Sequence, residues 1–78
     1  MIININNERR INYDNVIDEQ LVEHRQTSVK IKFTFVNNSF VVLQMTEQNY
    51  TDFKNKTKFP IDNPVIDLKC VVVELLQG

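Results

Sequence analysis

The sequence predicts a small α+β fold, in which an antiparallel sheet of three to four strands is accompanied by one or two short helices. Three observations predict it. Residues 28–45 alternate apolar and polar side chains on both arms of a hairpin, and residues 65–76 form a second long β-type run. The chain also contains no alanine, the best helix former, and is rich in β-branched residues, so sheet should outweigh helix.

The hairpin is expected to form the centre of the sheet. Its first arm, 28–36, places Val29, Ile31, Phe33 and Phe35 on one face, and its second arm, 40–45, follows across Asn37-Asn38-Ser39. A two-residue turn would pair Val36 with Ser39. A three-residue loop would instead create the pairs Phe35–Val41, Phe33–Leu43 and Ile31–Met45. We favour this loop, with an asparagine in the left-handed conformation, because it gathers six apolar side chains on one face.

The N-terminal third is predicted to hold a strand and a helix. Residues 1–5 are apolar and β-branched and run into a turn at Asn6-Asn7. Over 14–24, the apolar positions fit a helical stripe better than strict alternation, and Asp14 can cap the first turn. We therefore expect a first helix there, with a hairpin over 9–24 as the alternative because its valines suit a strand equally well.

A second helix is predicted from Glu47 to about Asn55. Thr46 precedes it as an N-cap, and Tyr50 and Phe53 lie three residues apart on one face. After it, Phe59-Pro60 favours extended chain and Asp62-Asn63-Pro64 favours a turn.

The closing stretch, Val65 to Leu76, is predicted to be one long strand. Its first half alternates, but Val71, Val73 and Leu75 make the second half apolar on both sides. Such a strand is either central in a covered sheet or carries apolar surface to a partner. We favour self-association through this strand, because a two-fold pairing closes an edge that would otherwise invite aggregation.

The sequence does not contain the residues that several kinds of active site require. His24 is the lone histidine and stands among charged residues, so it is more often solvated than catalytic, and Cys70 lies among valines where a cysteine is normally inert. One cysteine and one histidine leave a tetrahedral metal site without enough ligands, and the single glycine, Gly78, excludes a phosphate-binding loop. We therefore expect no enzyme, no metal and no cofactor.

Composition and length bear on where the chain works. Seventy-eight residues fit one domain, 1–78, with a marginal core, and a single cysteine allows no internal disulfide. No apolar run approaches a signal peptide or a membrane span, so we expect a cytoplasmic protein. Ten asparagines, eight isoleucines and six lysines are typical of an AT-rich genome, which hints at a low-GC bacterium or at a phage within one.

Two charged clusters are candidate interaction surfaces beside the apolar residues of the last strand. The acidic cluster would lie on adjacent rows of the first helix and consists of Asp14, Asp18, Glu19 and Glu23. It could mimic phosphates or hold a cation, although a solvated helix face is the commoner explanation. The basic cluster of Lys54, Lys56 and Lys58 stands between two phenylalanines, as in nucleic-acid sites, but three lysines in one loop make nucleic acid a less favoured partner.

These observations favour a non-enzymatic protein-binding module. The first hypothesis is an accessory protein of a phage or mobile element that inhibits a host defence protein by occupying its surface. Anti-CRISPR and other anti-defence inhibitors are of this general kind, being very small and without cofactors. The alternatives are a structural or assembly subunit of a phage particle or other oligomer, and a small nucleic-acid-binding regulator.

Overall fold

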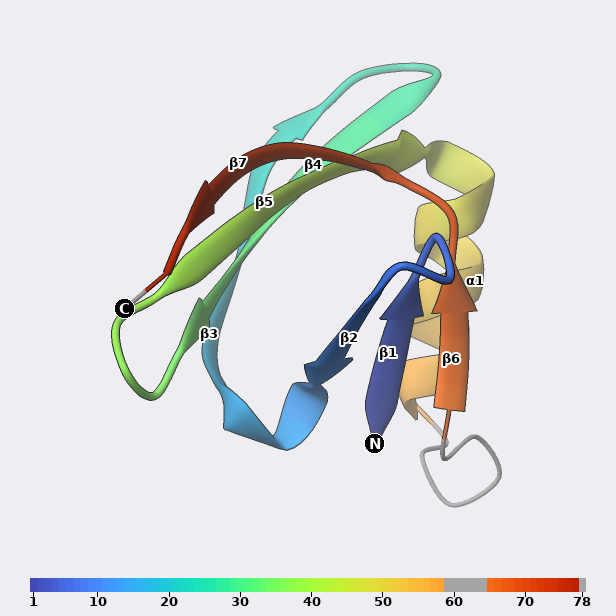
Figure 1. The fold of residues 1–78 in the computed structure, drawn as a ribbon. Helices are drawn as coiled ribbons and strands as arrows, with labels where there is room; N and C mark the ends of the chain where they lie inside the picture. Colours follow the sequence, from blue (N-terminus) through green and yellow to red (C-terminus); the bar gives the residue numbers. More distant parts are fainter. Residues whose placement is uncertain (59–64, 78) are drawn as a thin grey trace.

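The structure is a computed structural model that describes residues 1–58 and 65–77 (Figure 1). Two sheets and one α-helix confirm the predicted α+β class. In chain order the elements are β1 (Ile2–Ile5), β2 (Arg9–Asn12), the 3-10 turn η1 (Tyr13–Asn15), β3 (Val16–His24), β4 (Ser28–Phe35), β5 (Phe40–Thr46), α1 (Glu47–Lys58), β6 (Val65–Leu68) and β7 (Val71–Leu76). The features predicted at Phe59-Pro60 and at 62–64 lie outside the described residues.

The larger sheet has the strand order β3-β4-β5-β7 and is antiparallel throughout, with the predicted hairpin as its two central strands. Its loop has three residues, as predicted, but they are 36–38 instead of 37–39, because the Phe35 N–H donates to the Ser39 carbonyl (2.8 Å). Asn38 adopts the predicted left-handed conformation (φ 67°). The preferred register was wrong by two residues, since Phe33 pairs with Val41 and Ile31 pairs with Leu43. An even shift keeps every side chain on its predicted face, so the core face is unchanged.

The helix predicted over 14–24 is wrong, because these residues form η1 and the nine-residue strand β3. Two register shifts against β4 leave Ile17 and Val22 as extra residues in bulges. Each bulge resets the alternation and creates an adjacent apolar pair, Val16-Ile17 and Leu21-Val22. The interrupted strand pattern imitates the stripe of an amphipathic helix.

The single long strand predicted over 65–76 is also wrong, because the chain changes sheets at Lys69-Cys70. β6 lies parallel to β1 in the smaller sheet, whose order is β2-β1-β6, whereas β7 lies antiparallel to β5 in the larger one. At the crossing, side-chain amides replace the missing ladder: the Cys70 N–H donates to Asn6 Oδ1 (3.0 Å), and Asn49 Nδ2 donates to the Lys69 carbonyl (3.1 Å). The backbone groups at the corner thus have partners.

The first strand and its turn are as predicted: β1 ends at Ile5, and Asn6-Asn7 forms the turn that leads into β2. Both asparagines adopt the left-handed conformation (φ 54° and 58°), and the Glu8 N–H donates to the Ile5 carbonyl, as in the type I′ turn that suits the twist of paired strands. This turn brings β2 back along β1 and places Arg9 and Arg10 next to it.

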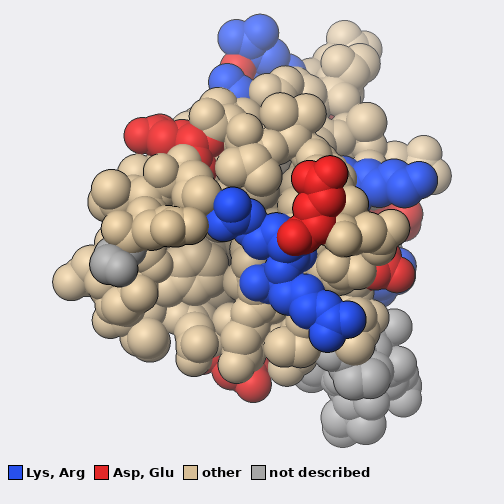
Figure 2. Space-filling model, in the orientation of Figure 1, with Lys and Arg blue, Asp and Glu red and all other residues tan. Residues whose placement is uncertain are grey.

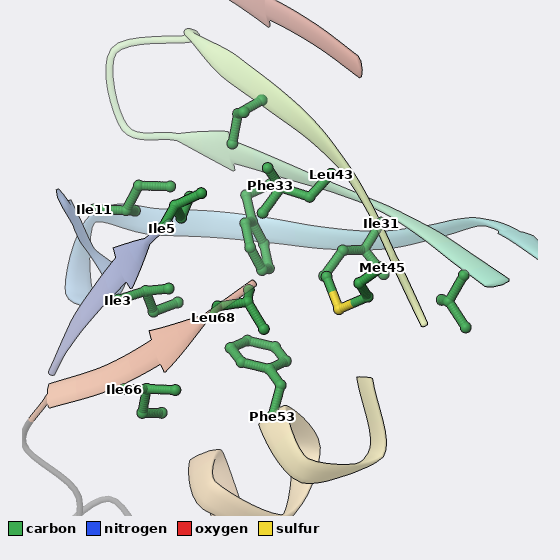
Figure 3. Packing of buried hydrophobic residues seen from close by; sticks show 12 residues of the cluster. Ile3, Ile5, Ile11, Ile31, Phe33, Leu43, Met45, Phe53, Ile66 and Leu68 are labelled. Atoms are coloured by element: carbon green, nitrogen blue, oxygen red, sulfur yellow. The ribbon is translucent and has the colours of Figure 1, made fainter. Parts of the chain in front are cut away.

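The core lies between the two sheets, and α1 contacts strands of both, β6 in one and β4 and β5 in the other. Figure 3 shows Phe33 from β4 and Phe53 from α1 pointing toward one another, with their ring centroids 5.8 Å apart. Asn49 N–H donates to Thr46 Oγ1, which confirms the predicted N-cap, and α1 continues to Lys58 instead of ending near Asn55.

Candidate functional site

The most conspicuous surface feature is β7, an edge strand with its apolar side chains in solvent. It pairs with β5 on one side only, so the backbone groups of its other side have no strand beside them among the described residues. All six residues are exposed and five of them are apolar, with Val71 63% and Val73 47% accessible. Long apolar edges are rare on soluble proteins because they template pairing with another chain.

The opposite edge of the same sheet, β3, is protected from such pairing. Its two bulges bend the strand, Asp18 and Glu19 stand between the apolar pairs, and Glu23 follows the second pair. Bulges and charges are the usual devices that prevent edge-to-edge association. β3 thus has two bulges and three carboxylates, whereas β7 has one bulge and one carboxylate, so β7 is the more open of the two edges.

The two faces of β7 differ in chemistry. Leu75 pairs with Val41 and Val72 with Leu43, so these two side chains lie on the face of the sheet that carries the core. Glu74, the one charged residue of the strand, pairs with Val42 and therefore lies on the outer face. Val73 is the extra residue of a bulge between these pairs.

An open pocket of about 480 Å³ adjoins the C-terminal end of β7. Ile11 from β2, Phe35 from β4 and Leu75 from β7 contribute apolar surface to it, and Arg9 and Arg10 are its charged lining residues. Figure 2 shows Lys and Arg side chains gathered in the middle of the face that it displays, at the position that β2 occupies in Figure 1. Sequence reasoning did not single out these arginines, because nothing near them in the sequence indicates the remote strand that they meet.

The predicted acidic and basic clusters do not form separate surfaces. Glu19 of one cluster accepts a hydrogen bond from Lys54 Nζ of the other (2.6 Å) and a second from the Tyr13 hydroxyl (2.8 Å). Burial and the Glu19 carboxylate together raise the pKa of Tyr13 to about 12. These three side chains join α1 to β3 and η1, which is a structural role.

The other members of the two clusters are scattered. Glu23 forms ion pairs with Arg25 and with Lys30 (3.3 Å), and the hydrogen bond from Lys30 is the main reason that its pKa lies below the usual range. Asp18 is exposed on β3, and Asp14 accepts from the N-terminal ammonium group (3.4 Å). The remaining basic residues, Lys56 and Lys58, are exposed on the last turn of α1.

Cys70 and His24 have separate surroundings. Cys70 sits at the corner between the sheets, where burial raises the pKa of its thiol to about 11. His24 lies at the end of β3 beside Tyr50 (ring centroids 6.4 Å) and Glu47 (3.9 Å). No hydrogen bond joins Cys70 to His24 within the described residues. At neutral pH the thiol is protonated and therefore a weak nucleophile.

A larger open pocket, of about 760 Å³, lies at this corner. Its lining is rich in amide side chains, but several of these groups already hold the backbone. Asn6 Nδ2 donates to the Cys70 carbonyl (2.6 Å), and Asn4 Nδ2 is shared between Asn7 Oδ1 and Asp67 Oδ1 (3.0 Å each). These amide groups of the pocket therefore hold the chain in place at the corner between the two sheets.

Across residues 1–58 and 65–77, no group of three or more His, Cys, Asp or Glu side chains is placed to hold a metal ion. The one helix described there, α1, is too short and too polar to cross a membrane. No protein-family model, no curated protein and no solved structure matches this chain. The exposed edge of β7 and the adjoining arginine pocket are therefore the features on which a functional proposal can rest.

Proposed function

We propose that this chain is a non-enzymatic protein-binding module, and that a partner protein adds an extended segment to the free edge of β7. The observation that supports this proposal is an edge strand on which all six side chains are exposed and five are apolar. The β3 edge supplies a contrast of degree, since it carries two bulges and three carboxylates whereas β7 carries one bulge and one carboxylate.

The addition of a strand would use both the backbone groups and the side chains of this edge. The unpaired N–H and C=O groups of β7 offer main-chain hydrogen bonds to an incoming strand, and alternate side chains offer apolar contacts on each face. Val72 and Leu75 would contact the incoming strand on the core side, and Leu76 would contact it on the outer side. This mode of binding needs no cofactor and no catalytic group.

The residue usage favours one form of this proposal, an accessory protein of a phage or mobile element that works in the host cytoplasm. In that form it inhibits a host defence protein by occupying its surface, as anti-CRISPR proteins do. An assembly subunit would use the same strand, with another particle protein as its neighbour. Nucleic-acid binding through the basic cluster has less support, because Lys54 is held by Glu19.

The direct experiment is co-purification of the tagged chain from its native host, with matched edge variants. Val73→Glu places a charge on the β7 edge, and Ile17→Glu places one on a bulge of the opposite edge at a similarly exposed position (47% and 60%). Both variants should remain folded by circular dichroism and melting. We expect a stoichiometric protein partner that Val73→Glu loses and Ile17→Glu retains.

The identity of the partner then separates the hypotheses. A defence protein favours the inhibitor, and other particle proteins favour the assembly subunit. Nucleic acid as the co-purifying species, or a protein partner that both edge variants retain, would contradict binding at β7.

A second copy of the chain is the competing occupant of this edge. Sedimentation of the purified protein at micromolar concentration decides it, because a β7-paired dimer would become a folded monomer in Val73→Glu and in Leu75→Glu. If the wild type sediments as a monomer of 9.2 kDa and both variants unfold, the strand is needed for folding and the edge is not a binding site.

A further inference from the structure

We infer that the segment which adds to β7 carries a carboxylate, and that Arg9 and Arg10 bind this group at the C-terminal end of the strand. The inference rests on the proposed function, since it concerns the partner's side chains at the same edge. It names the chemistry of the partner: an extended apolar segment with an acidic residue at one end.

The two arginines line the pocket at the C-terminal end of β7, the end that an added strand would reach. The pocket beside the end of β7 is lined by Arg9 and Arg10 from β2 together with Leu75 and Leu76 from β7, so both arginines share a pocket with the last two residues of the edge strand. Arg9 alternates onto the same side of β2 as the buried Ile11 and is itself half-buried, so its side chain belongs to the side that faces the pocket. A strand paired with β7 would direct every second side chain to that side.

Within the described residues, no carboxylate forms an ion pair with the positively charged arginines of the pocket. Neither arginine takes part in an ion pair there, whereas Arg25, Lys30 and Lys54 all have carboxylate partners. The lining contains no aspartate or glutamate, and Glu8, which precedes Arg9, is not part of it. The guanidinium group of Arg9 is suited to bidentate hydrogen bonds with a carboxylate. Arg10 alternates to the other side of β2 but also lines the pocket, so it adds positive charge there.

A second copy of this chain would not supply the carboxylate. A two-fold pairing of β7 with itself keeps each face of the sheet continuous, so the Glu74 of the second copy would lie on the outer face, away from Arg9. Glu74 is the one acidic residue of β7. A different protein is therefore the better match to this combination of an apolar edge and a basic end.

A phosphate group would satisfy the same charges, but the surroundings favour a peptide. Ile11, Val41 and Leu75 provide apolar surface directly beside the guanidinium groups, and the adjoining edge offers a peptide backbone its hydrogen bonds. A nucleic-acid site would be expected to continue as a basic path with stacking aromatics. The apolar residues of β7 do not provide such a path.

The test is a selection from a display library of random linear peptides on the full chain, with the Val73→Glu variant as a parallel bait. We expect enriched peptides that alternate apolar residues and carry Asp or Glu near one end. Replacing that acidic residue by its amide should weaken binding of the synthetic peptide by about tenfold, as for loss of one charge-assisted contact. The variant with Arg9→Ser and Arg10→Ser should bind the acidic and amide peptides equally.

The matched control carries Lys56→Ser and Lys58→Ser, which remove the same charge on α1 and should preserve the preference for the acidic peptide. Peptides that need β7 but show no acidic preference would overturn this inference and leave the proposed function standing. If no peptide is enriched, or if enrichment survives Val73→Glu, both proposals fail. Tighter binding of inorganic phosphate than of acetate, followed by shifts of the arginine side-chain resonances, would overturn the carboxylate in favour of a phosphate.

Discussion

Replacement of Phe33 by alanine should remove a large share of the stability of this fold. The side chain is fully buried, and its ring lies against Tyr13 (centroids 5.9 Å) and Phe53 (5.8 Å), so it joins the larger sheet to η1 and α1. Truncation of such a phenylalanine costs about 3–5 kcal/mol. At roughly 0.05–0.15 kcal/mol per residue, a 78-residue chain has about 4–12 kcal/mol in total.

Urea unfolding followed by circular dichroism measures this loss, with thermal melting as a second readout. A loss of 3 kcal/mol or more corresponds to a fall of at least about 12 °C in Tm for a domain of this size. The matched control is Phe40→Ala, which removes the same ring from the outer face of β5, where it is half-buried beside Lys32 (4.3 Å) and should cost clearly less. A Tm shift of one or two degrees for Phe33→Ala, or equal losses in the two variants, would refute the assignment of the core face.

Three further predictions concern titrating and charged groups. Because the pKa of Tyr13 is raised to about 12 in the folded chain from 10.0, stability should be complete below about pH 10 and fall as the pH rises toward 12, and Tyr13→Phe should flatten that fall; an unchanged alkaline loss would contradict this. Alkylation of Cys70 by iodoacetamide should be slow at neutral pH and accelerate toward pH 11, whereas rapid neutral reaction would show an activated thiol. A double-mutant cycle of Glu19→Gln and Lys54→Met should give a coupling of about 1 kcal/mol or less that falls with salt, and zero coupling at low salt would show that the ion pair contributes nothing.

The central hairpin could be predicted because alternation over two consecutive arms has few other solutions. The apolar positions determine which face is buried, and Phe33 and Ile31 are indeed in the core. They do not determine the pairing itself, since a shift by two residues preserves both faces. The observed register follows from the turn that places Asn38 in the left-handed conformation, with its N–H donating to the Phe35 carbonyl.

The wrong assignments of residues 14–24 and 65–76 have a common physical origin in contacts between distant residues. Nothing in the strand-like pattern of residues 65–76 marks the change of sheet at Lys69-Cys70, which is held by amide groups of the remote Asn6 and Asn49. The bulges at Ile17 and Val22 likewise depend on pairing with β4, and without that pairing the spacing of apolar residues resembles a helix.

The candidate site was predictable in part. Val71, Val73 and Leu75 could be selected because the sequence is apolar on both faces there, and such a strand needs either cover on both sides or a partner. The structure places it at an edge with these side chains exposed. The arginine pocket could not be found from the sequence, because Arg9 and Arg10 meet the end of β7 only after the chain has crossed between the sheets.

Amide hydrogen exchange in β7, with and without a bound partner or selected peptide, tests the central claim most directly. In the free chain, amides that donate to β5 should exchange slowly, and those that point away from β5 should exchange rapidly. Binding should protect the outward amides of β7 and leave those of the β3 edge unchanged. Outward amides of β7 that are already protected in the free monomer, or protection on binding that appears elsewhere, would contradict strand addition at this edge.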